Sequence, residues 1–121
     1  MAKILDLKTF TDKRGNLTVI EKEIPFEIKR IFYIYGVDSS TRGNHRHKTT
    51  RQALISLQGK CTIHNNNGHK KEVFELDSPH KCLILEPEDW HYMNNFSPDC
   101  ILQVFASTYF NADDYIYEEY K

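Results

Sequence analysis

The stretch Arg42-Gly43-Asn44-His45-Arg46-His47-Lys48 decides how this chain is interpreted. It places two imidazoles two residues apart, in a region whose composition is typical of extended chain. Residues i and i+2 of a β-strand point to the same face of a sheet, so His45 and His47 are expected to stand side by side. Two groups that titrate near neutral pH and share one cavity suit either proton transfer or metal binding.

Short runs rich in Ile, Val, Tyr, Phe and Leu flank this stretch on both sides, and turn residues separate them. Segments 12–15, 58–59 and 65–68 carry the Gly, Asn and Asp residues of tight turns. This punctuation favours an antiparallel sandwich or barrel. We expect strands at 3–7, 16–21, 30–35, 43–47, 52–57, 61–65, 71–76, 81–85, 91–94 and 100–106. A short helical tail at 112–120, with Asn111 as its N-cap, completes the prediction.

Size and charge set the class of protein. With 121 residues and a net charge of -1, the chain is expected to form one domain, residues 1–121, with a core of its own. The charge gives no case for a nucleic-acid or membrane partner. No window approaches the ~18 apolar residues of a membrane span, and no signal peptide is evident, so we expect a cytoplasmic protein. Cys61, Cys82 and Cys100 are widely spaced, as is typical of free thiols.

The spacing around the two histidines resembles the metal-binding motif of cupins, which are small jelly-roll proteins. In that motif a Glu follows the His-x-His pair after four intervening residues, and a Gly follows after six more. Here the same positions hold Gln52 and Gly59, so the carboxylate ligand has become an amide. Iron and manganese sites usually contain a carboxylate. A metal-free proton-transfer site is therefore favoured, with a metal site and two structural histidines as the alternatives.

Other residues are candidates for substrate binding. His91 and Asn94 occupy the second cupin motif, which is Pro87-Glu-Asp-Trp-His-Tyr-Met-Asn here. Nearby cations repel a metal and attract a phosphate, and two arginines at a barrel mouth suit a diphosphate. Tyr33 and Tyr35 share one strand face and offer phenols to a sugar. The candidate cations are Arg14, Arg42 and Lys48.

Taken together, these blocks resemble the sugar 3,4-ketoisomerases, metal-free cupin-fold enzymes that act on dTDP-4-keto-6-deoxy-D-glucose. The resemblance runs nearly end to end. It rests on Arg42-Gly-Asn-His-Arg-His-Lys and Pro87-Glu-Asp-Trp-His-Tyr-Met, with support from Arg30-Ile-Phe-Tyr-Ile-Tyr, Phe96-Ser and Asp114-Tyr-Ile. It implies an isomerisation that moves the keto group from C4 to C3, without a cofactor. The product would feed an aminotransferase that makes 3-amino-3,6-dideoxy sugars for cell-surface glycans such as the O-antigen of lipopolysaccharide.

The resemblance also implies roles and an assembly. The catalytic trio falls on Tyr33, His45 and His47, and the family forms homodimers with exchanged N-terminal strands. We assign His45 as the carbon base and His47 as the shuttle between the two oxygens, with the reverse still open. A deoxysugar 3,5-epimerase and a non-catalytic sugar-nucleotide-binding cupin remain the alternatives. The configuration at C4 of the product, the nucleotide base and the downstream glycan stay undetermined.

Overall fold

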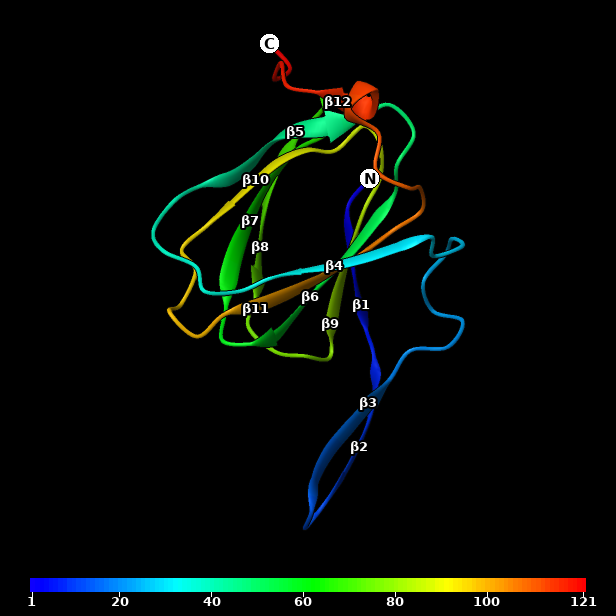
Figure 1. Cartoon of the computed structure of the whole chain (residues 1–121), viewed down its shortest axis with the longest axis vertical. Coiled ribbons are helices and arrows are strands. Elements are labelled where there is room, and N and C mark those ends of the chain that lie inside the picture. Colours follow the sequence, from blue (N-terminus) through cyan, green and yellow to red (C-terminus); the bar gives the residue numbers. More distant parts are fainter.

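The computed structural model describes residues 1–121 and consists almost entirely of β-strands. Two five-stranded antiparallel sheets, in the orders β1-β9-β6-β11-β4 and β12-β5-β10-β7-β8, form the two walls of a jelly-roll barrel (Figure 1). The strands are β1 Lys3–Asp6, β2 Lys8–Asp12, β3 Gly15–Val19, β4 Arg30–Ile34, β5 Arg42–His47, β6 Gln52–Gln58, β7 Cys61–Asn66, β8 Lys71–Leu76, β9 Lys81–Leu85, β10 Trp90–Asn94, β11 Ile101–Ala106 and β12 Tyr115–Ile116. The expected all-β antiparallel architecture is confirmed, and each of the ten expected strands has a counterpart.

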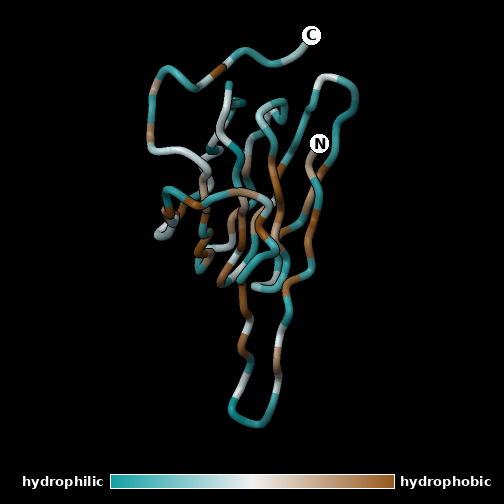
Figure 2. Tube along the Cα trace, turned by 90° about the vertical axis from the view of Figure 1, so that its right-hand side faces the viewer, coloured by the Kyte–Doolittle hydropathy of each residue, from teal (hydrophilic) through white to brown (hydrophobic).

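The core lies between the two sheets. Leu54, Leu83 and Leu102 of the first sheet meet Ile63 and Leu76 of the second, and all five are essentially inaccessible to solvent. A second apolar cluster covers the opposite face of the first sheet, where the segment before β4 packs Ile24 and Phe26 over it; its strand residues include Ala53, Ile55, Cys82, Ile84 and Phe105. Hydrophobic residues are correspondingly concentrated in the barrel strands (Figure 2). The three cysteines are free and buried.

Strand β4 shows how alternation sorts side chains between these two faces. Phe32 and Ile34 pack against the core between the sheets. Ile31 and Tyr33 point the other way, and Tyr33 is 59% exposed. Because successive residues of a strand face opposite sides, one position decides whether a β4 side chain enters the barrel. Tyr33 does not enter it.

The hairpin of β2 and β3 leaves the barrel as an arm (Figures 1 and 2). Its strands are paired from Lys8–Val19 to Asp12–Gly15, which confirms the expected turn at 12–15. Phe10 and Leu17 on this arm are 54% and 60% exposed. An arm with apolar side chains in solvent cannot be stabilised by the barrel it comes from, and such surfaces commonly mark a contact with another chain.

The C-terminal segment differs from the expected tail. Its helical part is a single 3-10 turn, η1 Ala112–Asp114, which Asn111 caps by accepting a hydrogen bond from the Asp113 N–H. The chain then becomes extended as β12 and pairs with β5, placing Tyr115 opposite His47. The expected helical tail at 112–120 is therefore limited to this one turn, and the chain after it forms an edge strand of the second sheet. No helix has the length and apolar character needed to cross a membrane.

Candidate active site

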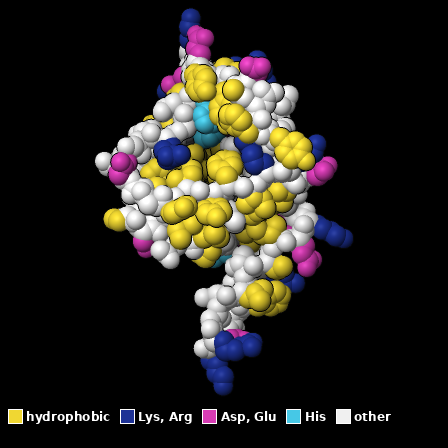
Figure 3. Space-filling view, in the orientation of Figure 1, with side chains coloured by type: hydrophobic (Ala, Val, Ile, Leu, Met, Phe, Trp, Pro, Cys, Tyr) yellow, Lys and Arg dark blue, Asp and Glu magenta, His cyan; other side chains and the backbone are white.

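A cavity of about 180 Å³ opens between the sheets at the end of the barrel near β5. Figure 3 shows histidine atoms in a hollow on this face, with Lys or Arg atoms on either side. Polar groups meet apolar walls here, as is typical of small-molecule sites. The lining residues are Phe32, Ile34, Arg42, Gly43, His45, Gln52, Leu54, His91, Met93, Val104 and Tyr115.

Strand β5 carries the histidine pair, and its start is irregular. Gly43 has φ +95°, and a Cβ there would lie 3.0 Å from the carbonyl oxygen of His91, so only glycine fits against β10. Asn44 also has a positive φ of 60°. The pairing of β5 with β10 shifts at this point, and His45 then lies opposite His91. The bulge sets which side chains of β5 face the barrel interior.

The three imidazoles form one cluster. The ring centroids of His45 and His47 are 5.0 Å apart at an interplanar angle of 87°, and His91 lies 5.0 Å from His45. The expectation that His45 and His47 share one side of the sheet is therefore met. His91 also lines the cavity, as the second motif predicted. Gln52 occupies the cavity wall where a cupin would present its carboxylate, and the chain has no group of three or more His, Cys, Asp or Glu side chains arranged to hold a metal ion.

Burial keeps these histidines uncharged at neutral pH. Burial lowers the pKa of His45 below its ordinary value, although a hydrogen bond with the Gly43 backbone partly raises it. Burial also lowers the pKa of His47, against the opposing effect of Asp114. The pKa of His91 falls to about 3, chiefly by burial. Neutral imidazoles are proton acceptors, so the cluster is in the form that general-base catalysis requires.

Two residues of the C-terminal segment that the sequence analysis did not select as site residues lie against the histidines. The carboxylate of Asp114 accepts a 2.8 Å hydrogen bond from Nδ1 of His47. The ring of Tyr115 lies 4.7 Å from both His45 and His47 and lines the cavity. A phenol thus lines the cavity beside His45, and a buried carboxylate–imidazole pair lies directly behind these two rings. The only signal in the sequence was the resemblance of Asp114-Tyr-Ile to the family pattern.

Of the predicted tyrosines and cations, the structure places one in the cavity and the others elsewhere. Arg42 lines the cavity, as predicted. Tyr33 and Tyr35 stack on each other at 5.8 Å on the outer side of β4, away from the histidines of the same subunit. Lys48 is exposed at the end of β5, and Arg14 is exposed at the tip of the β2–β3 hairpin, where it pairs with Asp12 at 2.7 Å. The β4 residues that line the cavity are Phe32 and Ile34, the two neighbours of Tyr33.

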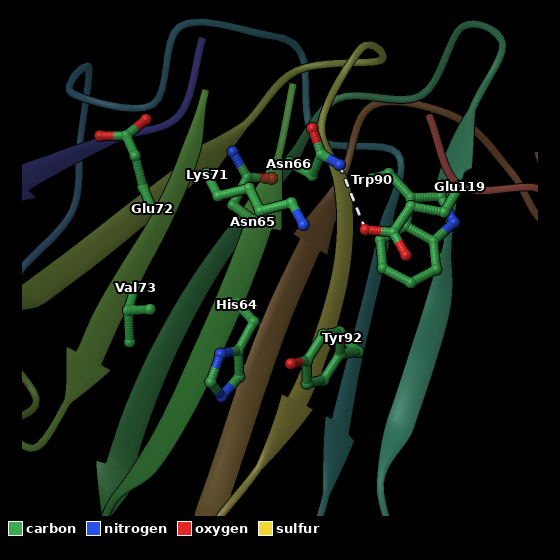
Figure 4. A pocket seen from close by; sticks show the side chains of 9 residues that line it. All are labelled: His64, Asn65, Asn66, Lys71, Glu72, Val73, Trp90, Tyr92 and Glu119. Atoms are coloured by element: carbon green, nitrogen blue, oxygen red, sulfur yellow. Dashed lines mark hydrogen bonds between the residues drawn. The ribbon is translucent and has the colours of Figure 1, made fainter. Parts of the chain in front are cut away.

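Asn94 lies on the other side of the second sheet from His91. Its Oδ1 is 3.0 Å from Nε2 of His64, whose ring stacks on Tyr92 at 4.4 Å. This outer side has a hollow of about 290 Å³, shown in Figure 4. Side chains of β7, β8 and β10 line it, and Asn66 donates a hydrogen bond to Glu119 of the tail across it. Its lining includes one histidine, His64, and no histidine pair, so the inner cavity is the candidate active site.

Comparison with known proteins identifies relatives over the whole chain. A family model described as FdtA: WxcM-like, C-terminal, matches residues 1–121. A TDP-4-oxo-6-deoxy-alpha-D-glucose-3,4-oxoisomerase of Aneurinibacillus thermoaerophilus is 40% identical over 124 residues, which cover 98% of this chain and 89% of the relative. The crystal structure of a 3,4-ketoisomerase from Helicobacter canadensis superimposes with a TM-score of 0.91 and 41% identity, over 97% of this chain and 90% of that one.

A mutant of the 3,4-ketoisomerase QdtA from Thermoanaerobacterium thermosaccharolyticum, in which a histidine is replaced by asparagine, has been crystallised with TDP-4-keto-6-deoxyglucose. That structure matches with a TM-score of 0.91 and 38% identity, over 97% of this chain and 87% of QdtA. The similarity in sequence and in structure thus covers nearly the whole chain. The chain therefore belongs to the sugar 3,4-ketoisomerase family that the FdtA, WxcM-like C-terminal model describes.

Proposed function

We propose that this protein is a metal-independent 3,4-ketoisomerase that converts dTDP-4-keto-6-deoxy-D-glucose to a dTDP-linked 3-keto-6-deoxyhexose. The observation that carries the proposal is the pair of uncharged imidazoles in a chain of this family: His45 lines the cavity, and the buried ring of His47 lies 5.0 Å from it. The 3-keto product is the electrophile that a sugar 3-aminotransferase needs. We place residues 1–121 in the cytoplasm as one catalytic domain.

The isomerisation is a sequence of proton transfers. A base removes the proton from C3, and the electron pair of that C–H bond forms the C3–C4 double bond while the C4 carbonyl becomes an enolate oxygen. A proton then passes from the oxygen on C3 to the oxygen on C4, and C4 receives a proton as the C3 ketone forms. We assign the carbon steps to His45, which lines the cavity, and the oxygen-to-oxygen step to His47. General acid–base catalysis of this type contributes about 10²–10⁴-fold.

A phenol and a guanidinium complete the proposed pocket. Tyr115 lies against both histidines, so we assign it the sugar-polarising role that the sequence suggested for Tyr33. Arg42 lines the same cavity and supplies positive charge for the developing enolate or for a phosphate. His91 stays neutral and forms part of the wall beside His45.

Arg14 can act only at the cavity of a second subunit. It sits at the tip of the β2–β3 arm, whose apolar residues Phe10 and Leu17 are in solvent. The outer side of β4 adds exposed Ile31 and Tyr33 to the apolar surface of the same chain. A homodimer with exchanged N-terminal arms would cover these side chains and bring Arg14 to the diphosphate at the partner's cavity.

Two other functions are separated by one experiment. Chelator-treated enzyme is incubated with dTDP-4-keto-6-deoxyglucose, and the sugar is followed by NMR. A 3,4-ketoisomerase forms the 3-keto sugar, a 3,5-epimerase exchanges the hydrogens at C3 and C5 and keeps the ketone at C4, and a binding protein leaves the sugar unchanged. His45→Asn and His47→Asn are expected to lose about 10²-fold or more in rate. His69→Asn, at an exposed histidine, is the matched control and should retain full activity.

A further inference from the structure

The carboxylate of Asp114 is the most heavily hydrogen-bonded side chain near the cavity. Its Oδ1 accepts from the Thr49 N–H at 2.8 Å and from the Thr49 hydroxyl at 2.9 Å. Its Oδ2 accepts from the Thr50 hydroxyl at 2.5 Å and contacts Nδ1 of His47 at 2.8 Å. Asp114 is only 8% exposed. Every donor around it comes from β5 or the turn that follows, so this side chain adds to the backbone pairing of β12 with β5 in holding the tail against that strand.

These bonds hold Asp114 as an anion. Burial favours the neutral acid, but the hydrogen bonds from Thr50, Thr49 and His47 outweigh it and lower the pKa of this carboxyl well below its usual range. An ionised carboxylate can only accept hydrogen bonds. The neutral His47 must therefore carry its proton on Nδ1, where it donates to Asp114.

The opposite nitrogen of His47 is then a bare acceptor. Nε2 is buried and has no hydrogen-bond partner in the protein. Leaving a buried acceptor unpaired is unfavourable for folding, so its presence calls for an explanation. The groups around this ring are His45 and Tyr115, whose rings lie 5.0 and 4.7 Å away, with Arg30 adding positive charge that disfavours protonation. His45 and Tyr115 both line the cavity, and an open lone pair on the ring packed against them fits a proton acceptor.

We propose that Asp114 is the positioning residue of the isomerase: it fixes His47 as the Nδ1–H tautomer, so that Nε2 accepts the proton that passes between the two sugar oxygens. The proposal rests on the proposed function for the identity of that proton. When Nε2 takes the hydroxyl proton of the sugar, His47 becomes an imidazolium, and the adjacent carboxylate stabilises this charge. When the proton leaves for the other oxygen, the neutral tautomer returns. This transfer between the two oxygens needs no oxidant, no reductant and no base besides His47.

The geometry makes Asp114→Asn a sharp test. Oδ1 faces a backbone N–H, which can only donate, so the amide oxygen of an asparagine must take that position. The amide NH₂ then replaces Oδ2 and points a donor at Nδ1 of His47. Nδ1 of His47 can accept a hydrogen bond from this NH₂ group only if the proton of the ring moves to Nε2. The variant thus keeps the side-chain shape and reverses the tautomer, a change that costs about 10⁴-fold in kcat in the Ser-His-Asp enzymes.

The experiment combines ¹⁵N NMR of the histidine ring nitrogens with kinetics. We expect wild-type His47 at neutral pH to show a protonated Nδ1 and an unprotonated Nε2, and Asp114→Asn to show the reverse. We expect the variant's kcat to fall about 10²–10⁴-fold with little change in KM. Asp113→Asn, an exposed aspartate in the same 3-10 turn, removes the same charge and should change neither readout.

A protonated Nε2 in the wild type, or full kcat in a folded Asp114→Asn enzyme, would overturn the proposal. If Asp114→Asn does not fold, the wild-type NMR decides, and Thr50→Val supplies a milder variant that removes one donor to the carboxylate. Thr50→Val should lower kcat while the His47 tautomer stays as in the wild type. The NMR result does not depend on the substrate, so an enzyme with the expected tautomer but no 3-keto product would contradict the proposed function alone.

Discussion

His91 makes the stability of this protein depend on pH in a way that can be calculated. Its side chain is 1% exposed, and burial with two neighbouring histidines lowers its pKa from the model-peptide value of 6.5 to about 3. Between these values the unfolded chain binds a proton that the native state excludes. Stability is therefore complete above pH 6.5 and falls as the pH decreases towards 3.

The slope is one proton, or about 1.4 kcal/mol per pH unit. Because protonation of the unfolded chain begins gradually near pH 6.5, the contribution lost between pH 7.5 and pH 5 is about 2 kcal/mol. Other groups titrate in the same range, so the comparison must be made with a variant. In His91→Gln this term is absent, and the loss of unfolding free energy over that interval should be smaller by about 2 kcal/mol.

The assay is equilibrium unfolding in urea at pH 7.5 and pH 5, with tryptophan fluorescence as the probe. His69→Gln, at an exposed position, is the control and should keep the wild-type pH dependence. Equal pH dependence in the wild type and in His91→Gln would refute the reasoning, because His91 would then be protonated as readily in the folded state as in the unfolded chain.

Three further predictions concern the site. Tyr115→Phe should lower kcat at least about ten-fold, because the ring of Tyr115 lies against both histidines. Tyr33→Phe should keep a kcat near that of the wild type, because Tyr33 is exposed on the outer side of β4. Steady-state kinetics that rank the two variants the other way would contradict the assignment. Arg14→Ala and His45→Asn dimers, each expected to be inactive, can be mixed so that their subunits exchange. Half of the dimers then contain one intact site out of two, so about a quarter of wild-type activity should return. No recovery would mean that Arg14 does not act at the partner's cavity. Gly43→Ala should lower kcat/KM about 10²-fold, because the new Cβ would push on the His91 carbonyl. Gly36 also has a positive φ but has open space around it, so Gly36→Ala should not lower kcat/KM. Equal losses in the two variants would point to backbone strain alone.

Much of the fold could be predicted because its signals are local. Alternation, turn residues and hairpin spacing identified the strands of the barrel, and the two-residue period correctly put His45 and His47 on one side of β5. The arm strand β2 and the edge strand β12 were not anticipated. β2 is polar apart from Phe10, and β12 has only two residues, so neither shows the apolar alternation of a strand that faces a core.

The assignment of side chains to faces was less reliable, because it depends on single-residue register. Tyr33 belongs to the right strand, but the core residues Phe32 and Ile34 on either side of it force it outward. Asn94 follows His91 by three residues, an odd interval that puts the two on opposite sides of a regular strand. Counting along the strand could have shown this for Asn94, whereas the cupin motif alone could not.

The contact of Asp114 with His47 could not be read from the sequence. The two residues are 67 positions apart, and their meeting depends on the tail folding back as β12 beside β5. An isolated aspartate in an acidic tail is normally solvated. Only the pairing of the edge strand turns this one into a buried anion at the active site.

The location of solvent hydrogen in the product tests the paired-imidazole chemistry most directly. The reaction is run in deuterium oxide with chelator-treated enzyme, and the 3-keto sugar is examined by NMR. Proton transfer through an enediol, with His45 as the carbon base, predicts deuterium at C4. An enzyme that turns over only after a stoichiometric metal is restored, or His45→Asn and His47→Asn variants that form the deuterated 3-keto sugar at the wild-type rate, would show that the two histidines do not perform the chemistry assigned to them.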